Sequence, residues 1–257
     1  MAATLTFLGT GDAMGVPRVY CDCPVCTEAR TAGRNRRLRS SALVRDGRGC
    51  LLIDCGPDWR LQMESAGLRA VDAVLITHPH HDHIGGLPEL ADAVRWTGRR
   101  VPVAAPPRVL AEIQARYPWL GQYLVFTPLT GPAEFLGFRV TAWEVNHGHN
   151  GRSYGLRLER PGFAWAYVPD SIHLSPAERE PLRGLDLLVL GTAYYREEAP
   201  VATRSLYDMV EALALLAEVR PRRAIFTHLS HGVDLREPYP LPPEVTLAED
   251  GMTVPLA

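Results

Sequence analysis

Four side chains that bind metal ions well lie within six residues of one another. The segment reads His78-Pro79-His80-His81-Asp82-His83, and the candidates are His78, His80, Asp82 and His83. Imidazole and carboxylate groups bind zinc and other divalent ions, and a metal-bound water becomes a nucleophile at neutral pH. Without a metal, groups packed this densely would repel one another when charged. The spacing predicts His78 and His80 on one ion, and Asp82 and His83 on a second.

A two-metal centre needs more ligands than this loop contains, and three later strands each run into a His or an Asp. Residues 139–145 lead to His147, residues 163–168 lead to Asp170, and residues 224–227 lead to His228. Strand ends at one edge of a sheet bring their side chains to one point. We assign His147 to the first ion, His228 to the second and Asp170 as a bridge. His149 is the alternative to His147, although we expect it to face solvent or substrate.

A second cluster contains Cys21, Cys23 and Cys26, in the pattern C-x-C-x2-C. Three thiolates can hold a tetrahedral zinc ion but need a fourth ligand. The candidate is His231, because one loop can send His228 to the catalytic ions and His231 to a closed site nearby. Five cysteines is an odd number and favours a metal site over a disulfide framework. We therefore expect one structural zinc and no disulfide; the alternative is three ordinary loop cysteines.

Short apolar runs and amphipathic stretches alternate along the chain and must position these side chains. Strands are expected at residues 4–8, 41–44, 51–53, 71–77, 139–145, 153–158, 163–168, 187–190 and 224–227. Helices are expected at residues 58–66, 88–96, 107–116 and 205–219. Early strands follow one another like hairpins and later ones alternate with helices, which favours two packed mixed sheets with helices outside. Residues 127–132 are rich in turn formers and are the best seam between two halves.

Composition limits the number of domains and the partners. The chain has 257 residues, 46% of them hydrophobic, with a formal net charge of -2 and a pI near 6.5. This is enough apolar material for one large core, so a single domain over residues 1–257 is expected. The near-neutral charge gives no global attraction to nucleic acid or anionic membranes. The first residues do not resemble a signal peptide and no stretch could span a bilayer, so a cytoplasmic location is expected.

The order of the predicted ligands resembles the metallo-β-lactamase superfamily. The matching positions are His78, His80, Asp82, His83, His147, Asp170 and His228. The resemblance implies an α/β chain with the four-layer αββα sandwich of the metallo-β-lactamase fold, and hydrolysis through a metal-bridging hydroxide. Asp82 would orient that hydroxide, and Asp54 would orient the metal loop. Zinc is favoured at the two catalytic positions, with manganese or iron as alternatives.

Further motifs resemble one branch of that superfamily, the PhnP-like branch, which contains the cyclic phosphodiesterase of the carbon–phosphorus lyase pathway. They are residues 7–11, 15–17, the three cysteines, and residues 36–41, 54–60 and 227–231. The resemblance implies a phosphodiesterase that acts on a small cyclic or nucleotide-like phosphodiester, with His231 as the fourth ligand of the structural zinc. A small-molecule phosphodiester is therefore the expected partner. Nucleic acid is not favoured, a membrane is not expected, and a homodimer is left open.

One position departs from that branch. Its members commonly carry a His shortly before the last long helix, where it is thought to protonate the leaving group or bind phosphate, whereas this chain has Arg204. An Arg binds phosphate through two hydrogen bonds but cannot be a general acid near neutral pH. The alternative is an exposed Arg at a helix N-terminus, and His173 or His149 is then the candidate proton donor. Another candidate anion-binding set, with a solvated surface as its alternative, is Arg30, Arg34, Arg36, Arg37 and Arg39.

Three other functions fit the same features. An RNA endonuclease like tRNase Z shares the N-terminal glycine motif and an element like residues 227–230, but no long basic insertion for gripping tRNA is visible. Thioester, lactone or β-lactam hydrolysis uses the same bimetal centre. A non-hydrolytic accessory protein is suggested by similarity to pyrroloquinoline quinone biosynthesis protein B, which shares a Cys-rich loop. Those proteins usually have altered metal ligands, so the complete set here favours hydrolysis.

Overall fold

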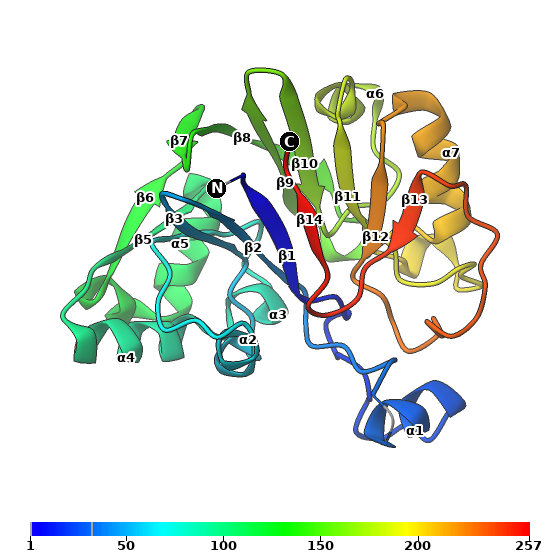
Figure 1. The fold of residues 1–257 in the computed structure, drawn as a ribbon, viewed down its shortest axis with the longest axis horizontal. Coiled ribbons are helices and arrows are strands. Elements are labelled where there is room, and N and C mark those ends of the chain that lie inside the picture. The colour runs from blue at the N-terminus through cyan, green and yellow to red at the C-terminus, as the bar shows by residue number, and fades with distance from the viewer. Residues whose placement is uncertain (1, 32) are drawn as a thin grey trace.

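Two mixed β-sheets lie face to face in the computed structural model, which describes residues 2–31 and 33–257 (Figure 1). Each sheet has seven strands. The first contains, in spatial order, β14 (Thr253–Pro255), β1 (Thr4–Gly9), β2 (Ser41–Asp46), β3 (Gly49–Ile53), β4 (Ala73–Leu75), β5 (Val101–Ala105) and β6 (Leu124–Pro128). The second contains β13 (Val245–Leu247), β12 (Ala224–Thr227), β11 (Leu187–Gly191), β10 (Phe163–Val168), β9 (Arg152–Arg160), β8 (Phe138–Asn146) and β7 (Ala133–Phe135).

The facing sides of the two sheets share one hydrophobic core. Leu5 and Phe7 reach it from β1, and Phe138 and Trp165 reach it from β8 and β10. Successive side chains of a strand point to opposite faces, so the alternation Leu5, Phe7 places both on the inner face, while Thr6 between them is only partly buried. Burial of this apolar surface holds the sheets together and fixes the relative position of their edges.

Helices cover the outer face of each sheet (Figure 1). The first sheet packs against α2 (Trp59–Ser65), α4 (Leu87–Thr97) and α5 (Pro107–Arg116). The second is covered by α6 (Pro176–Arg179) and α7 (Met209–Val219). The resulting stack of helices, sheet, sheet and helices is the αββα sandwich that the sequence predicts, and that prediction is confirmed. The helix α1 (Pro24–Thr31) projects away from the four layers, and the single turn α3 (His81–Ile84) lies at the sheet edge.

The segments that connect the strands and helices include the predicted seam between the two halves of the chain. The predicted seam at residues 127–132 covers the end of β6 and the turn to β7, where the chain passes from the first sheet to the second. Short 3-10 turns complete the connections: η1 (Pro118–Gln122), η2 (Gly148–Asn150), η3 (Glu180–Leu182) and η4 (Val201–Thr203). The described residues contain no helix long and apolar enough to cross a bilayer. The single domain over residues 1–257 stays a prediction.

The last long helix starts later than the sequence predicts. We expected it at residue 205, but α7 begins at Met209. Asp208 is the reason, because its carboxylate accepts the backbone N–H of Glu211 at 2.8 Å while the Glu211 side chain accepts the N–H of Asp208. This capping box fixes the helix start. Residues 205–208 are therefore free to contact the loops beside the second sheet.

Candidate metal centre

The predicted ligands meet where strands of both sheets end. His78 follows β4, and the turn after it carries the other ligands of the first half of the chain. In the second sheet β8, β10 and β12 point the same way, because β9 is antiparallel to the first two and β11 is parallel to β10 and β12. His147, Asp170 and His228 therefore leave the sheet at one edge. The centre lies across the joint between the two sheets.

At this edge the candidate ligand atoms form three groups, and the atoms within each group all lie within 4.8 Å of one another. They are His78, His80 and His147; His78, His83 and Asp170; and Asp82, His83 and His228. The first and third groups correspond to the two ions that we assigned from the sequence. The second contains Asp170, the predicted bridge. The structure thus brings all seven residues together, and their roles as ligands stay predictions.

Asp170 occupies the middle of the centre. Its Oδ2 lies 3.0 Å from Nε2 of His83 and 3.5 Å from Nε2 of His228, and its Oδ1 lies 3.6 Å from Nε2 of His147. Burial alone would raise the pKa of Asp170, but His228 and His83 hold that pKa well below its usual range. Asp170 is therefore a carboxylate with imidazoles on several sides, which is the arrangement that a bridging ligand requires.

Three of the histidines use Nδ1 for a supporting hydrogen bond, so that Nε2 is the nitrogen that faces the other candidate ligands. His83 Nδ1 donates to Asp54 at 2.7 Å, and His147 Nδ1 donates to the carbonyl of Ser205 at 2.8 Å. The Thr77 hydroxyl donates to Asp54, so His78 Nδ1 must be the donor in its 3.1 Å contact with that hydroxyl. A metal-binding imidazole is oriented in this way, by a hydrogen bond through the nitrogen that does not face the ion.

The charges and the unsatisfied atoms at the centre fit divalent cations. Burial lowers the pKa of His78 and of His147, so both imidazoles are neutral near pH 7, the form in which an imidazole can bind a cation. In the part of the chain that the structure describes, buried atoms without a hydrogen-bond partner include Nε2 of His147, Nε2 of His228 and Oδ2 of Asp170. Buried polar atoms are rarely left without a partner. Cations at the two predicted positions would satisfy these atoms.

Asp54 and Thr77 make the hydrogen bonds that orient the loop of candidate ligands, residues 78–83. Asp54 has a positive φ of 59°, a conformation that costs about 1 to 3 kcal/mol for a residue other than glycine. Its carboxylate accepts the backbone N–H of Thr77 at 2.8 Å and the Nδ1 proton of His83. Asp54 therefore lies where the orienting role implied by the resemblance requires it. The sequence reasoning missed Thr77, although its place directly before His78 was the signal.

The loop after His147 needs a glycine. A Cβ atom on Gly148 would lie 2.2 Å from the carbonyl oxygen of Arg204, and its φ of +57° is left-handed. We expect Gly148→Ala to displace the His147 ring and so to lower the metal occupancy of the site that contains His147. The free energy of unfolding should fall by about 2 kcal/mol or more. Urea unfolding and bound metal per chain measure both effects. The control is Gly98→Ala, because Gly98 has a φ of 65° with open space around it; equal effects in the two variants would contradict the expectation.

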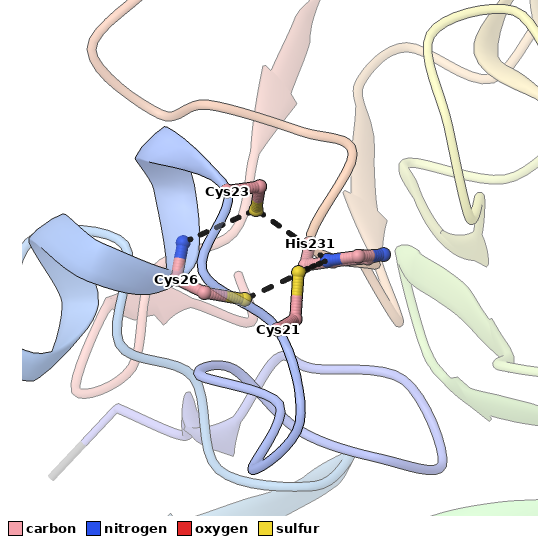
Figure 2. A group of neighbouring side chains, drawn as sticks. All are labelled: Cys21, Cys23, Cys26 and His231. Atoms are coloured by element: carbon pink, nitrogen blue, oxygen red, sulfur yellow. Dashed lines mark hydrogen bonds between the residues drawn. The ribbon is translucent and has the colours of Figure 1, made fainter.

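The four predicted ligands of the structural site also come together. Figure 2 shows the thiols of Cys21, Cys23 and Cys26 around the ring of His231, with Sγ to Nδ1 distances of 3.3, 3.6 and 3.6 Å. Burial raises the pKa of the Cys26 thiol to about 11, so a bound cation would be needed to make it a thiolate at neutral pH. The cluster connects the projecting α1 to the segment that follows β12.

Arg37 corrects one interpretation of the sequence. We grouped it with arginines that bind phosphate or face solvent, but Arg37 is 1% exposed. Its Nη2 donates to the carbonyls of Ser230 and Val233, both at 2.9 Å. These carbonyls flank His231, so Arg37 holds the segment that carries both His228 and His231. Sequence reasoning missed this role because carbonyls almost two hundred residues away leave no local signal.

Arg204, His173 and His149 are not part of the ligand cluster. Arg204 is 5% exposed and its guanidinium contacts carboxylates. The interpretation of Arg204 as an exposed Arg is therefore wrong, and a role of Arg204 in binding phosphate stays a prediction. The side chain of His173 is 42% exposed and lies 3.5 Å from Glu211. His149 is exposed on η2, as expected. A role for His173 or His149 as proton donor stays a prediction.

Residues 50–229 match the family described as Beta-lactamase superfamily domain, and the chain belongs to that superfamily. The chain also resembles a solved structure described as a new diphosphatase from the PhnP family, with a TM-score of 0.86 and 30% identity over 98% of this chain and 97% of that one. The resemblance that the motifs indicated is thereby confirmed. Members of this superfamily are mostly metal-dependent hydrolases, so the fold and the clustered ligands imply divalent metal ions.

The curated relatives have different activities. The chain is 31% identical to an octanoyltransferase of Porphyromonas gingivalis over 95% of its own length, but it spans only 50% of that protein. It is 28% identical to a coenzyme PQQ synthesis protein B of Methylobacterium radiotolerans, with 88% of this chain and 89% of that protein covered. It is 30% identical to a ribonuclease Z of Lachnospira eligens over 49% of this chain and 45% of that protein. These relatives leave the substrate open.

Proposed function

We propose that this chain is a hydrolase with two divalent ions at the centre and a third, structural zinc at the cysteine cluster. The observation that supports it most is the convergence on Asp170 of imidazoles from three separate chain segments. Zinc is the favoured ion because histidines dominate the ligand set, and manganese or iron is the alternative. When bound, the ions would lower the pKa of water and stabilise negative charge on the substrate.

The residues of the chain would divide the remaining work. Asp170 would keep the two halves of the centre at a fixed separation, because its two carboxylate oxygens face ligands of both groups. Asp82 lies 3.1 Å from Nε2 of His83 and is mostly buried, and it would orient the attacking water and accept its proton. Asp54 would keep the His83 ring in the tautomer that presents Nε2.

A small phosphodiester is the substrate class that we propose. A cavity of about 150 Å³ borders His80 and is also lined by Arg108, Asn150 and Tyr154. Arg108 contacts Glu112 only at 3.6 Å and its side chain is 66% exposed, so its guanidinium can turn toward a phosphate oxygen. The likeness to a diphosphatase supports the same chemistry. The cavity suits a small molecule better than a folded RNA, and we keep a homodimer and a cytoplasmic location as further predictions.

The experiment combines metal counting with a substrate panel. We expect the purified protein to carry close to three ions per chain and to cleave bis(p-nitrophenyl) phosphate and ribose cyclic phosphates, and chelation to abolish cleavage. Precursor tRNA, thioesters and lactones tested in parallel separate the other hydrolases. Cleavage of precursor tRNA alone would favour the ribonuclease, and cleavage of thioesters or lactones alone would favour acyl chemistry. Inactivity of a fully loaded protein on every substrate would favour an accessory role like that of the PQQ proteins.

A further inference from the structure

Arg204 is a buried cation surrounded by carboxylates. Its Nε donates to Glu197 at 3.1 Å, and its two terminal nitrogens donate to the two oxygens of Glu211 at 3.0 and 2.6 Å. The Oδ2 atom of Asp208 lies 3.6 Å from Nη2. A carboxylate that holds a guanidinium through two parallel hydrogen bonds fixes its orientation and also compensates its charge. The Arg204 side chain is therefore immobilised, and its charge is already compensated.

The backbone of the same residue touches the loop that carries a metal ligand. The carbonyl of Arg204 accepts the backbone N–H of His149 at 3.0 Å. The next carbonyl, that of Ser205, accepts the Nδ1 proton of His147 at 2.8 Å. The Arg204 carbonyl also packs so closely on Gly148 that a Cβ atom there would lie 2.2 Å from it. The position of residues 204 and 205 thus sets the orientation of the His147 ring.

Glu211 connects this arrangement to α7. Besides holding Arg204, its carboxylate accepts the backbone N–H of Asp208 at 3.2 Å in the capping box. One carboxylate therefore fixes both the start of the helix and the guanidinium. A chain of direct contacts runs from the first turn of α7 through Glu211 and Arg204 to the Ser205 carbonyl and the ring of His147.

We propose that Arg204 is a positioning residue of the metal centre. Fixed by Glu197, Asp208 and Glu211, it holds the carbonyl that keeps Nδ1 of His147 protonated and Nε2 directed at the ion. Its function is to preserve affinity for the ion shared by His78, His80 and His147, and it neither binds phosphate nor donates a proton. This inference rests on the proposed two-metal function.

Removal of the guanidinium should weaken one ion selectively. In Arg204→Gln the three carboxylates lose their common cation and repel one another, so the backbone at residues 204 and 205 moves. Changes to groups that orient a metal ligand reduce metal affinity by about 10- to 100-fold. We expect a loss of about tenfold for one of the two ions at the centre. The second ion and the cysteine site share no contact with Arg204, so their affinities should stay as in the wild type.

In the experiment, metal-free protein is titrated with Zn²⁺ alone and the binding is measured by calorimetry. The titration is repeated with Co²⁺, because the absorption spectrum of bound Co²⁺ distinguishes thiolate sites from imidazole sites. The matched control is Arg157→Gln. Arg157 is also a partly buried Arg that donates to backbone carbonyls, those of Pro181 and Arg183, and to Glu159. Arg204→Lys is the conservative variant; it keeps the charge but loses the two-pronged hydrogen bond, so we expect an affinity between wild type and Arg204→Gln.

The outcomes are separable. A weakened single ion in Arg204→Gln, with both ions retained in Arg157→Gln, supports the inference. Unchanged affinities in Arg204→Gln, or an equal loss at all three sites, overturn it even if the melting temperature falls. If Arg204→Gln does not fold, Glu197→Gln carries the same test, because it removes one partner of Arg204 and leaves the capping box intact. Wild-type protein that binds no ion at the centre overturns the proposed function and the inference with it.

Discussion

Asp170→Asn is expected to lower kcat/KM on a phosphodiester by more than about a hundredfold while the protein stays folded. Loss of a group one contact removed from a metal lowers activity or affinity by up to about that factor, and Asp170 would contact both ions directly. Asparagine keeps the size of the side chain but removes the charge that His228 and His83 share. Bound metal at the centre should fall as well. Steady-state kinetics, metal analysis and circular dichroism measure the three quantities.

Asp186→Asn is the matched control for this prediction. Asp186 is a mostly buried carboxylate that accepts the backbone N–H of Ala164 at 2.9 Å and pairs with Arg222 at 3.1 Å, but it belongs to no group of candidate ligands. We expect its turnover to stay within about twofold of the wild type. If Asp170→Asn kept most of its activity and both ions, Asp170 would not be a bridge.

Cys23→Ser should mainly destabilise the protein. The thiol faces Nδ1 of His231 beside two other thiols, and the loss of a structural metal is among the few single changes that remove several kcal/mol. We expect the free energy of unfolding to fall by about 3 kcal/mol or more, with one ion fewer per chain. The folded fraction should keep most of its turnover. Urea unfolding and metal analysis test this.

Cys50→Ser serves as the control for the thiol itself. Cys50 is a partly buried cysteine of β3, outside the cysteine cluster, so its replacement should retain all ions. The contrast with Asp170→Asn matters most. If Cys23→Ser and Asp170→Asn both lost stability and neither lost turnover, the division into a structural and a catalytic site would be wrong.

The ligand cluster could be predicted from the sequence because each ligand follows an apolar run that reads as a strand. The strands 163–168 and 224–227 have the predicted bounds, and they place Asp170 and His228 at the same edge. The strands β7, β13 and β14 were missed because each has three residues, too few for an alternating pattern, and the five-residue strands β5 and β6 were missed as well. The α1 helix was missed because Cys26, which lies in it, was interpreted as part of a loop with Cys21 and Cys23.

The supporting residues could not be predicted, since their partners are distant in sequence or belong to the backbone. Arg204 looks like a surface residue until Glu197 and Glu211 fold around it. The Ser205 carbonyl that orients His147 has no side-chain signature at all. The ends of the strands determine where a ligand lies. Hydrogen bonds to distant side chains and to the backbone determine which way its ring faces.

The seam at residues 127–132 divides the candidate ligands unequally between two lengths of chain. His78 to His83 precede it, and His147, Asp170 and His228 follow it. An ion held at the joint would therefore add a link between two lengths of chain that already contact each other through the shared core, the pairing of β1 with β14 and the hydrogen bonds of Arg37. Each ion at a free concentration a thousand times its Kd would add about 4 kcal/mol against separation. Metal supply to the cell would then regulate the lifetime of this protein as well as its catalysis.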